Sequence, residues 1–148
     1  MLIWKFIHVL GVVLMLGNVI VTGLWALWAM QTRNQAIAVF AAEAIIRADW
    51  ILTFLGGAMI TIAGIMLVQA HQLDWWHTRW LREGILATGL STAVWLVALI
   101  PDQARMKRLG TAGEAEALRG IFLRWSVLGW GATVLLLWAL WVMITQPL

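Results

Sequence analysis

The sequence predicts an all-α protein, a bundle of four antiparallel transmembrane helices in a single integral membrane domain over residues 1–148. The composition is 63% hydrophobic and only 11% charged, and the mean hydropathy is +0.89. A soluble domain is about half apolar and a quarter charged. Four stretches reach the length of about 20 apolar residues that a spanning helix needs. The connectors between them leave no room for a separate soluble domain.

The first stretch covers residues 3–30 and is interrupted only by Lys5, His8 and Asn18. It is longer than the apolar core of a cleavable signal, and no small-residue cleavage site follows it. A helix of this length exceeds the hydrocarbon thickness, so we expect it to tilt or to project beyond the lipid. We interpret Asn18, in the middle of the span, as a contact to a neighbouring helix.

The other three spans are predicted at residues 50–70, 80–100 and 125–145. The second and fourth carry no charge, and the third has Arg82 and Glu83 at its start. Small residues recur in all three at helical spacings, which is typical of helices whose backbones approach closely in lipid.

The connectors supply further expectations. Residues 31–49 include an alanine-rich run that predicts a helical lead-in to the second span, lying in the membrane interface. Arg47 and Asp49, just before that span, are most simply a solvated pair at the membrane surface. Pro101 is expected to end the third helix and Pro147 the fourth, because proline cannot continue the backbone hydrogen-bond ladder.

The basic residues predict the orientation. Three lie on the side of the termini and the middle connector (Lys5, Arg79 and Arg82). Seven lie on the other side (Arg33, Arg47, Arg105, Lys107, Arg108, Arg119 and Arg124). Because basic loops stay in the cytoplasm, both termini are predicted on the outer, periplasmic side of a bacterial inner membrane. The partner is then the lipid bilayer, with a homo-oligomer or another membrane protein as further options, and not a nucleic acid.

Three spans each place one ionisable side chain near the same predicted face, and these are His8, His71 and Glu83. Such a group inside a membrane is costly unless paired, and it marks a potential functional site. Imidazole is a common axial ligand of haem and a ligand of copper or zinc. The sequence therefore suggests a cofactor site at His8, His71 and Glu83, with haem b as the cofactor, or a metal bound by His8 and His71.

Structural roles for the same residues stay open. His71 and His77 lie at or beyond helix ends, where they can simply be solvated. Glu83 can pair with Arg79, one helical turn earlier. His8 is embedded, but it can hydrogen-bond a neighbouring helix for packing alone. No H-x-x-H or H-E-x-x-H spacing occurs, which argues against a dedicated zinc site.

Two segments resemble a known family. The opening Trp4-Lys5-Phe6-Ile7-His8-Val9-Leu10-Gly11 is similar to the start of a bacterial family of predicted integral membrane proteins, the domain-of-unknown-function 2269 family. The ending is similar as well, with Pro101-Asp102-Gln103, a basic connector, Arg124-Trp125, Gly129-Trp130 and a last helix closing with Met143 and Pro147. The resemblance covers nearly the whole chain and implies a four-helix protein of the bacterial inner membrane.

The Lys-x-x-His pattern in the first helix also resembles small membrane protoporphyrinogen oxidases and copper-resistance D-type membrane domains. In the oxidase the first-helix histidine is implicated in haem binding, which here points to His8. The oxidase has a lysine in its third helix, whereas this chain reads Trp80-Leu81-Arg82-Glu83-Gly84.

Three function classes remain. The favoured one is a non-catalytic accessory or assembly component of the membrane, since the sequence carries no nucleophilic triad, phosphate loop or carboxylate pair. The second is a b-type haem or metal-binding redox protein that uses His8, assisted by His71 or Glu83. The third is a small transporter, ranked last because two spans lack charge and no pair of broken helices is visible in the sequence.

Overall fold

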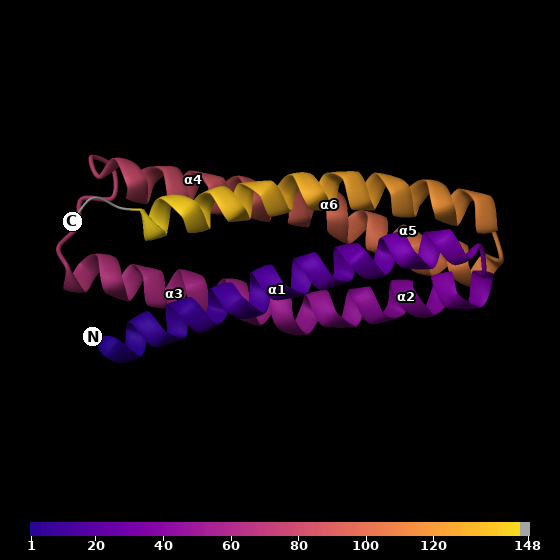
Figure 1. Cartoon of the computed structure of the whole chain (residues 1–148), viewed down its shortest axis with the longest axis horizontal. Helices are drawn as coiled ribbons and strands as arrows, with labels where there is room; N and C mark the ends of the chain where they lie inside the picture. The colour runs from indigo at the N-terminus through magenta and orange to yellow at the C-terminus, as the bar shows by residue number, and fades with distance from the viewer. Residues whose placement is uncertain (146–148) are drawn as a thin grey trace.

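The computed structural model describes residues 1–145 and contains four long antiparallel helices (Figure 1). All four are long and apolar enough to cross a membrane, which confirms the predicted fold class. The start of the first helix, the end of the fourth and the turn between the second and third lie at one end of the bundle (Figure 1). The other two connectors lie at the opposite end.

The first helix, α1, runs from Leu2 to Thr32. It ends at Arg33, whose backbone adopts a left-handed conformation with φ of 52°. Asn34 then caps the next helix, because its side-chain oxygen accepts hydrogen bonds from the N–H groups of Ala36 (2.9 Å) and Ile37 (3.3 Å). This local chemistry turns the chain back within two residues.

The second helix is continuous over 36 residues. It consists of α2 (Gln35–Ala48), a π-helical turn η1 (Asp49–Thr53) and α3 (Phe54–Ala70). The predicted lead-in is therefore helical, as expected, but it extends α3 in line instead of forming a separate interfacial helix (Figure 1). At 1.5 Å per residue the whole helix is about 54 Å long, so part of it lies beyond a hydrocarbon core of about 30 Å.

The third helix has the same construction, with α4 (Arg79–Val94), the π-helical turn η2 (Trp95–Leu99) and α5 (Ile100–Ala112). The expectation that Pro101 ends this helix is wrong. In a regular α-helix its ring would clash with the carbonyl of Val97, which lies within the widened turn η2. Pro101 follows η2 directly, as the second residue of α5.

The fourth helix, α6, runs from Ala115 to Ile144 after a left-handed turn at Gly113 with φ of 76°. The predicted helix end at Pro147 lies outside the described residues. α6 packs along α4 in one half of the bundle and along α5 in the other.

The contact between α1 and α3 depends on glycine. A Cβ atom on Gly11 would lie 2.8 Å from the carbonyl oxygen of Gly56, and a Cβ on Gly56 would lie 2.8 Å from that of Gly11. The two backbones therefore touch directly. Helices in lipid associate through such close backbone contacts, because an apolar side chain gains little free energy when it moves from lipid into the protein.

The two halves of the bundle are packed differently. At the basic end, α2 packs on α1 and α5, and α5 packs on α6. This half buries Ile45, Met106 and Phe122 almost completely. Beyond η1 and η2 the same helices diverge, with α3 packed on α1 and α4 on α6 (Figure 1). The point of divergence is where the polar residues of the interior gather.

Candidate intramembrane site

A buried carboxylate, Asp49, lies at the start of η1, and its side chain is held by three hydrogen-bond donors. One carboxylate oxygen accepts from Asn18 Nδ2 of α1 (2.8 Å) and from Thr53 Oγ1 (3.3 Å). The other oxygen accepts from Gln103 Nε2 of α5. Asn18 also donates to Thr53 Oγ1 at 2.9 Å. We call Asn18, Asp49, Thr53 and Gln103 the Asp49 cluster; it joins three of the four long helices.

The sequence interpretation of Asp49 as half of a solvated pair is wrong. Asp49 is only 3% exposed, and Arg47 turns instead toward Glu43, at 4.0 Å on the exposed face of α2. Successive residues of a helix, such as Ala48 and Asp49, point about 100° apart, so the sequence alone does not show which of them faces inward. The contacts of Asp49 with α1 and α5 turn it inward. The interpretation of Asn18 as an interhelical contact is confirmed, since its amide links α1 to η1.

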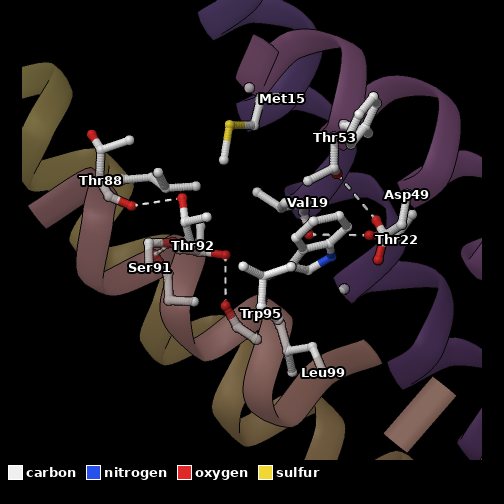
Figure 2. A pocket seen from close by; sticks show the side chains of 18 of the residues that line it. Met15, Val19, Thr22, Asp49, Thr53, Thr88, Ser91, Thr92, Trp95 and Leu99 are labelled. Carbon is white, nitrogen blue, oxygen red and sulfur yellow. Dashed lines mark hydrogen bonds between the residues drawn. The ribbon is translucent and has the colours of Figure 1, made fainter. Parts of the chain in front are cut away.

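A cavity of about 400 Å³ lies beside the Asp49 cluster. It separates α1, η1 and α3 from α4, η2 and α6, and Asp49 and Thr53 form part of its wall. Figure 2 shows Met15 and Val19 on one side and Thr88, Thr92 and Trp95 on the other. Most of the wall is apolar, so the cavity has one strongly polar end.

Within residues 1–145, two polar groups of the cavity wall lack a hydrogen-bond partner, the indole N–H of Trp125 and the hydroxyl of Ser126. The indole N–H of Trp95 is directed toward Asp49. In contrast, Ser91 donates to the backbone oxygen of Ala132 (3.0 Å), and Thr92 donates to that of Thr88 (2.9 Å). Unpaired polar groups in a protein interior are costly, so water bound beside Trp125 and Ser126 is favoured.

A second buried acid provides a comparison. Asp102 of α5 is fully buried, but two arginines reach it from the protein surface. Arg105 NH1 lies 3.4 Å from Asp102 Oδ1, and Arg124 Nε lies 3.2 Å from Asp102 Oδ2. The charge of Asp102 is thus compensated, whereas the donors to Asp49 are all neutral.

His8 lies against α3, away from this cavity. Its Nδ1 is 3.0 Å from the backbone oxygen of Ile60, and a Cβ on Gly64 would lie 3.4 Å from its ring. This is the packing hydrogen bond that the sequence left open as an alternative. An imidazole that donates through Nδ1 also keeps Nε2 free for a ligand.

The other two predicted ligands lie elsewhere. His71 is exposed and caps the end of α3. It lies seven residues beyond Gly64 (64 to 71), and therefore about two helical turns further out than His8. Glu83 accepts a hydrogen bond from Arg79 Nε at 2.7 Å, which is the ion pair considered as its alternative role.

The third histidine is exposed in the loop before α4. His77 Nδ1 lies 2.6 Å from Asp74 Oδ2, and the backbone N–H of His77 donates to Asp74 Oδ1 at 3.1 Å. This backbone hydrogen bond and the side-chain bond of His77 lower the pKa of Asp74. The pair fixes the loop and needs no cofactor to explain it.

His8, His71 and Glu83 have separate surroundings in the structure. Within residues 1–145, no three His, Asp or Glu side chains form a group that could hold a metal ion. His8 is not among the residues that line the cavity beside Asp49 or the smaller one near Arg33 and Phe122. The assignment of His8, His71 and Glu83 to haem b, or of the histidines to a metal, stays a prediction.

The sequence contained weak signals of the Asp49 cluster. Asp49 and Thr53 are spaced by one helical turn, and Asn18 is the one amide in the middle of the first span. An acid next to an apolar stretch is most simply placed at the membrane surface, so these signals do not by themselves predict a buried cluster. Neither π-helical turn has a distinctive sequence, so their positions were not predictable.

Four apolar antiparallel helices with their polar groups turned inward define a multi-pass integral membrane protein, which associates with the lipid bilayer. The chain belongs to the family of predicted integral membrane proteins DUF2269, which matches residues 2–147. No curated protein and no solved structure matches the chain.

Proposed function

We propose that this protein binds a small, mainly apolar molecule inside the membrane, in the cavity between α1–α3 and α4–α6. The cavity with Asp49 in its wall is the observation that carries this proposal. Its volume of about 400 Å³ is in the range of small-molecule sites, which are typically apolar with a few polar groups that orient the ligand. An ionisable residue inside a membrane bundle supports the same conclusion.

The wall also indicates where the molecule enters. Phe54 and Ile62 of the second helix and Leu96 of the third line the cavity and are at the same time 58%, 57% and 53% exposed. Residues that line the cavity and are also exposed on the protein surface mark the mouth of the cavity. This mouth therefore lies between the second and third helices. At this depth the surroundings are lipid, so the ligand would come from the bilayer.

The π-helical turns favour binding over a purely structural bundle. η1 supplies Asp49 and Thr53 to the cavity wall, and η2 supplies Trp95 and Leu99. π-Helical turns within α-helices are frequent at functional sites. Both helices stay continuous through these turns, so they support a binding site in the bundle and not the broken helices of a transporter.

A labelling experiment tests the proposal, and the chain is well suited to it because it contains no cysteine. Thr92→Cys places one thiol in the cavity wall, and we expect N-ethylmaleimide, a small uncharged reagent, to modify it in membranes. Gly129 lines the cavity, and a Cβ there meets nothing within 4 Å. Gly129→Phe should therefore fill the cavity and slow labelling by about tenfold or more.

Gly131→Phe is the matched control. Gly131 lies on the same helix, has equal free space around a Cβ, and is exposed outside the cavity wall. Labelling of Thr92→Cys should be unaffected by this change. Equal labelling rates with Gly129→Phe and Gly131→Phe, in variants that remain helical and monodisperse, would rule out an accessible cavity.

We further propose that the protein lies in a bacterial inner membrane with both termini outside. Seven of the ten basic residues lie in the half of the bundle that contains the first and third connectors, which supports a cytoplasmic location of that half. A single cysteine at exposed Thr111 should be labelled by an impermeant maleimide only after the membrane is opened, and one at exposed Gln72 before it. The reverse pattern would invert the orientation. An accessory or assembly role and a partner protein stay predictions.

A further inference from the structure

When ionised, Asp49 carries a charge that no side chain of residues 1–145 compensates. Its three partners, Asn18, Thr53 and Gln103, are neutral donors. The ion pairs found within residues 1–145 include none at Asp49. Neutral donors stabilise a carboxylate by hydrogen bonding, but they leave a net negative charge in a low-dielectric interior.

Three arginines of this half of the bundle are engaged elsewhere. Arg47 is exposed and faces Glu43, and both Arg105 and Arg124 face Asp102. Asp102 shows that this fold can compensate a buried acid with two guanidinium groups. At Asp49 the cavity occupies the place where such a group would approach.

The cavity wall beside Asp49 is suited to a cation. The indole of Trp95 lies next to Asp49 (Figure 2), and its ring meets Trp50 edge-on with centroids 5.9 Å apart. Trp130 and Phe54 also line the cavity. Aromatic faces attract organic cations, and most strongly where water is excluded.

We propose that the ligand is a monovalent organic cation, an ammonium group carried on an apolar body. This inference rests on the proposed binding function and names the ligand class. The ammonium group lies toward Asp49 and Trp95, and the apolar body fills the space toward Met15 and Leu136. The cation supplies the charge that no side chain supplies, and Coulomb attraction in this environment selects it over a neutral molecule of the same shape.

A free amphiphile and the headgroup of a lipid can both supply the ammonium group. The second helix is 36 residues long, about 54 Å, and extends beyond a hydrocarbon core of about 30 Å, so Asp49 is within reach of either source. The experiment distinguishes the two by the lipid of the nanodisc.

The test uses benzyltrimethylammonium and its neutral carbon isostere, neopentylbenzene, as protectants of Thr92→Cys against N-ethylmaleimide. The full chain is reconstituted in phosphatidylglycerol nanodiscs. We expect the cation to protect the thiol, and Asp49→Asn to raise its half-protecting concentration by about tenfold or more. Asp49→Glu, which keeps the charge, should retain most of the protection, and Glu43→Gln, a change at an exposed acid, should have no effect. Neopentylbenzene should protect the thiol equally with and without the Asp49→Asn substitution.

The outcomes distinguish a failure of the cation assignment from a failure of the proposed binding function. If both compounds protect equally in both backgrounds, the cavity binds small molecules without selecting charge, and the cation assignment fails alone. Protection by neopentylbenzene only, or by neither compound, also overturns it. If phosphatidylethanolamine nanodiscs protect the thiol without added compound, and Asp49→Asn removes that protection, the ammonium group belongs to a lipid and the site assignment holds.

Discussion

Gly56→Leu is expected to lower the free energy of unfolding by about 2–3 kcal/mol, as overpacking of a tight interior does. A Cβ at Gly56 would lie 2.8 Å from the carbonyl oxygen of Gly11 and 2.9 Å from Met15 Cβ. Neither neighbour can move without moving the backbone of α1. The variant must therefore separate α1 from α3, which make the most extensive helix contact of the bundle.

The neighbouring glycine is the control for this prediction. A Cβ at Gly57 would meet only the flexible sulfur of Met15, at 3.9 Å, so Gly57→Leu should cost far less. Both variants would be unfolded with sodium dodecyl sulfate from mild micelles and followed by far-ultraviolet circular dichroism. Equal stability of the two variants would contradict the direct backbone contact between α1 and α3.

Asn18→Leu is expected to destabilise the protein by about 2–3 kcal/mol, because it removes a donor from a buried carboxylate. Asn18 Nδ2 gives Asp49 its 2.8 Å hydrogen bond and also bonds Thr53. Leucine has a similar size, so the loss reflects the hydrogen bonds and not a cavity. The same detergent unfolding experiment measures it.

A double variant separates the hydrogen bond from other effects of the leucine. Asn18→Leu/Asp49→Leu should cost less than the sum of the two single variants, because the hydrogen bond between Asn18 and Asp49 is lost only once; Gln103 and Thr53 still lose their acceptor in the double variant. Thr61→Val is the control, since the Thr61 hydroxyl is exposed and bonds only within its own helix, to Gly57. If the stability loss of the double variant equals the sum of the losses of the two single variants, Asn18 and Asp49 are not energetically coupled.

The two predictions concern one piece of architecture. Gly11 and Gly56 set the distance between α1 and α3, and two turns further along the same pair of helices Asn18 meets Asp49 and Thr53. A change in helix spacing at the glycines should therefore weaken the Asp49 cluster. Such a change should lower stability and also the ligand binding proposed above.

The histidines illustrate that residue type alone does not show which side chains meet in the fold. His8 was singled out because an embedded imidazole is unusual, and its Nδ1 lies against a backbone oxygen of α3. His71 and Glu83 belong to other helices whose rotation about their axes was unknown. A helix buries or exposes a residue depending on that rotation, and one residue along the chain turns it by about 100°.

The sequence by itself determined the four spanning helices. In lipid every backbone group must be bonded within its own segment, so long apolar stretches become helices whatever their neighbours do. Only the tertiary structure decided that Asp49 faces inward, that the third helix continues through Pro101 by way of a π-helical turn, and that the helices diverge around a cavity. These features depend on how helices rotate and pack against one another, and that is set by contacts between residues far apart in the chain, such as Gly11 with Gly56 and Asn18 with Asp49.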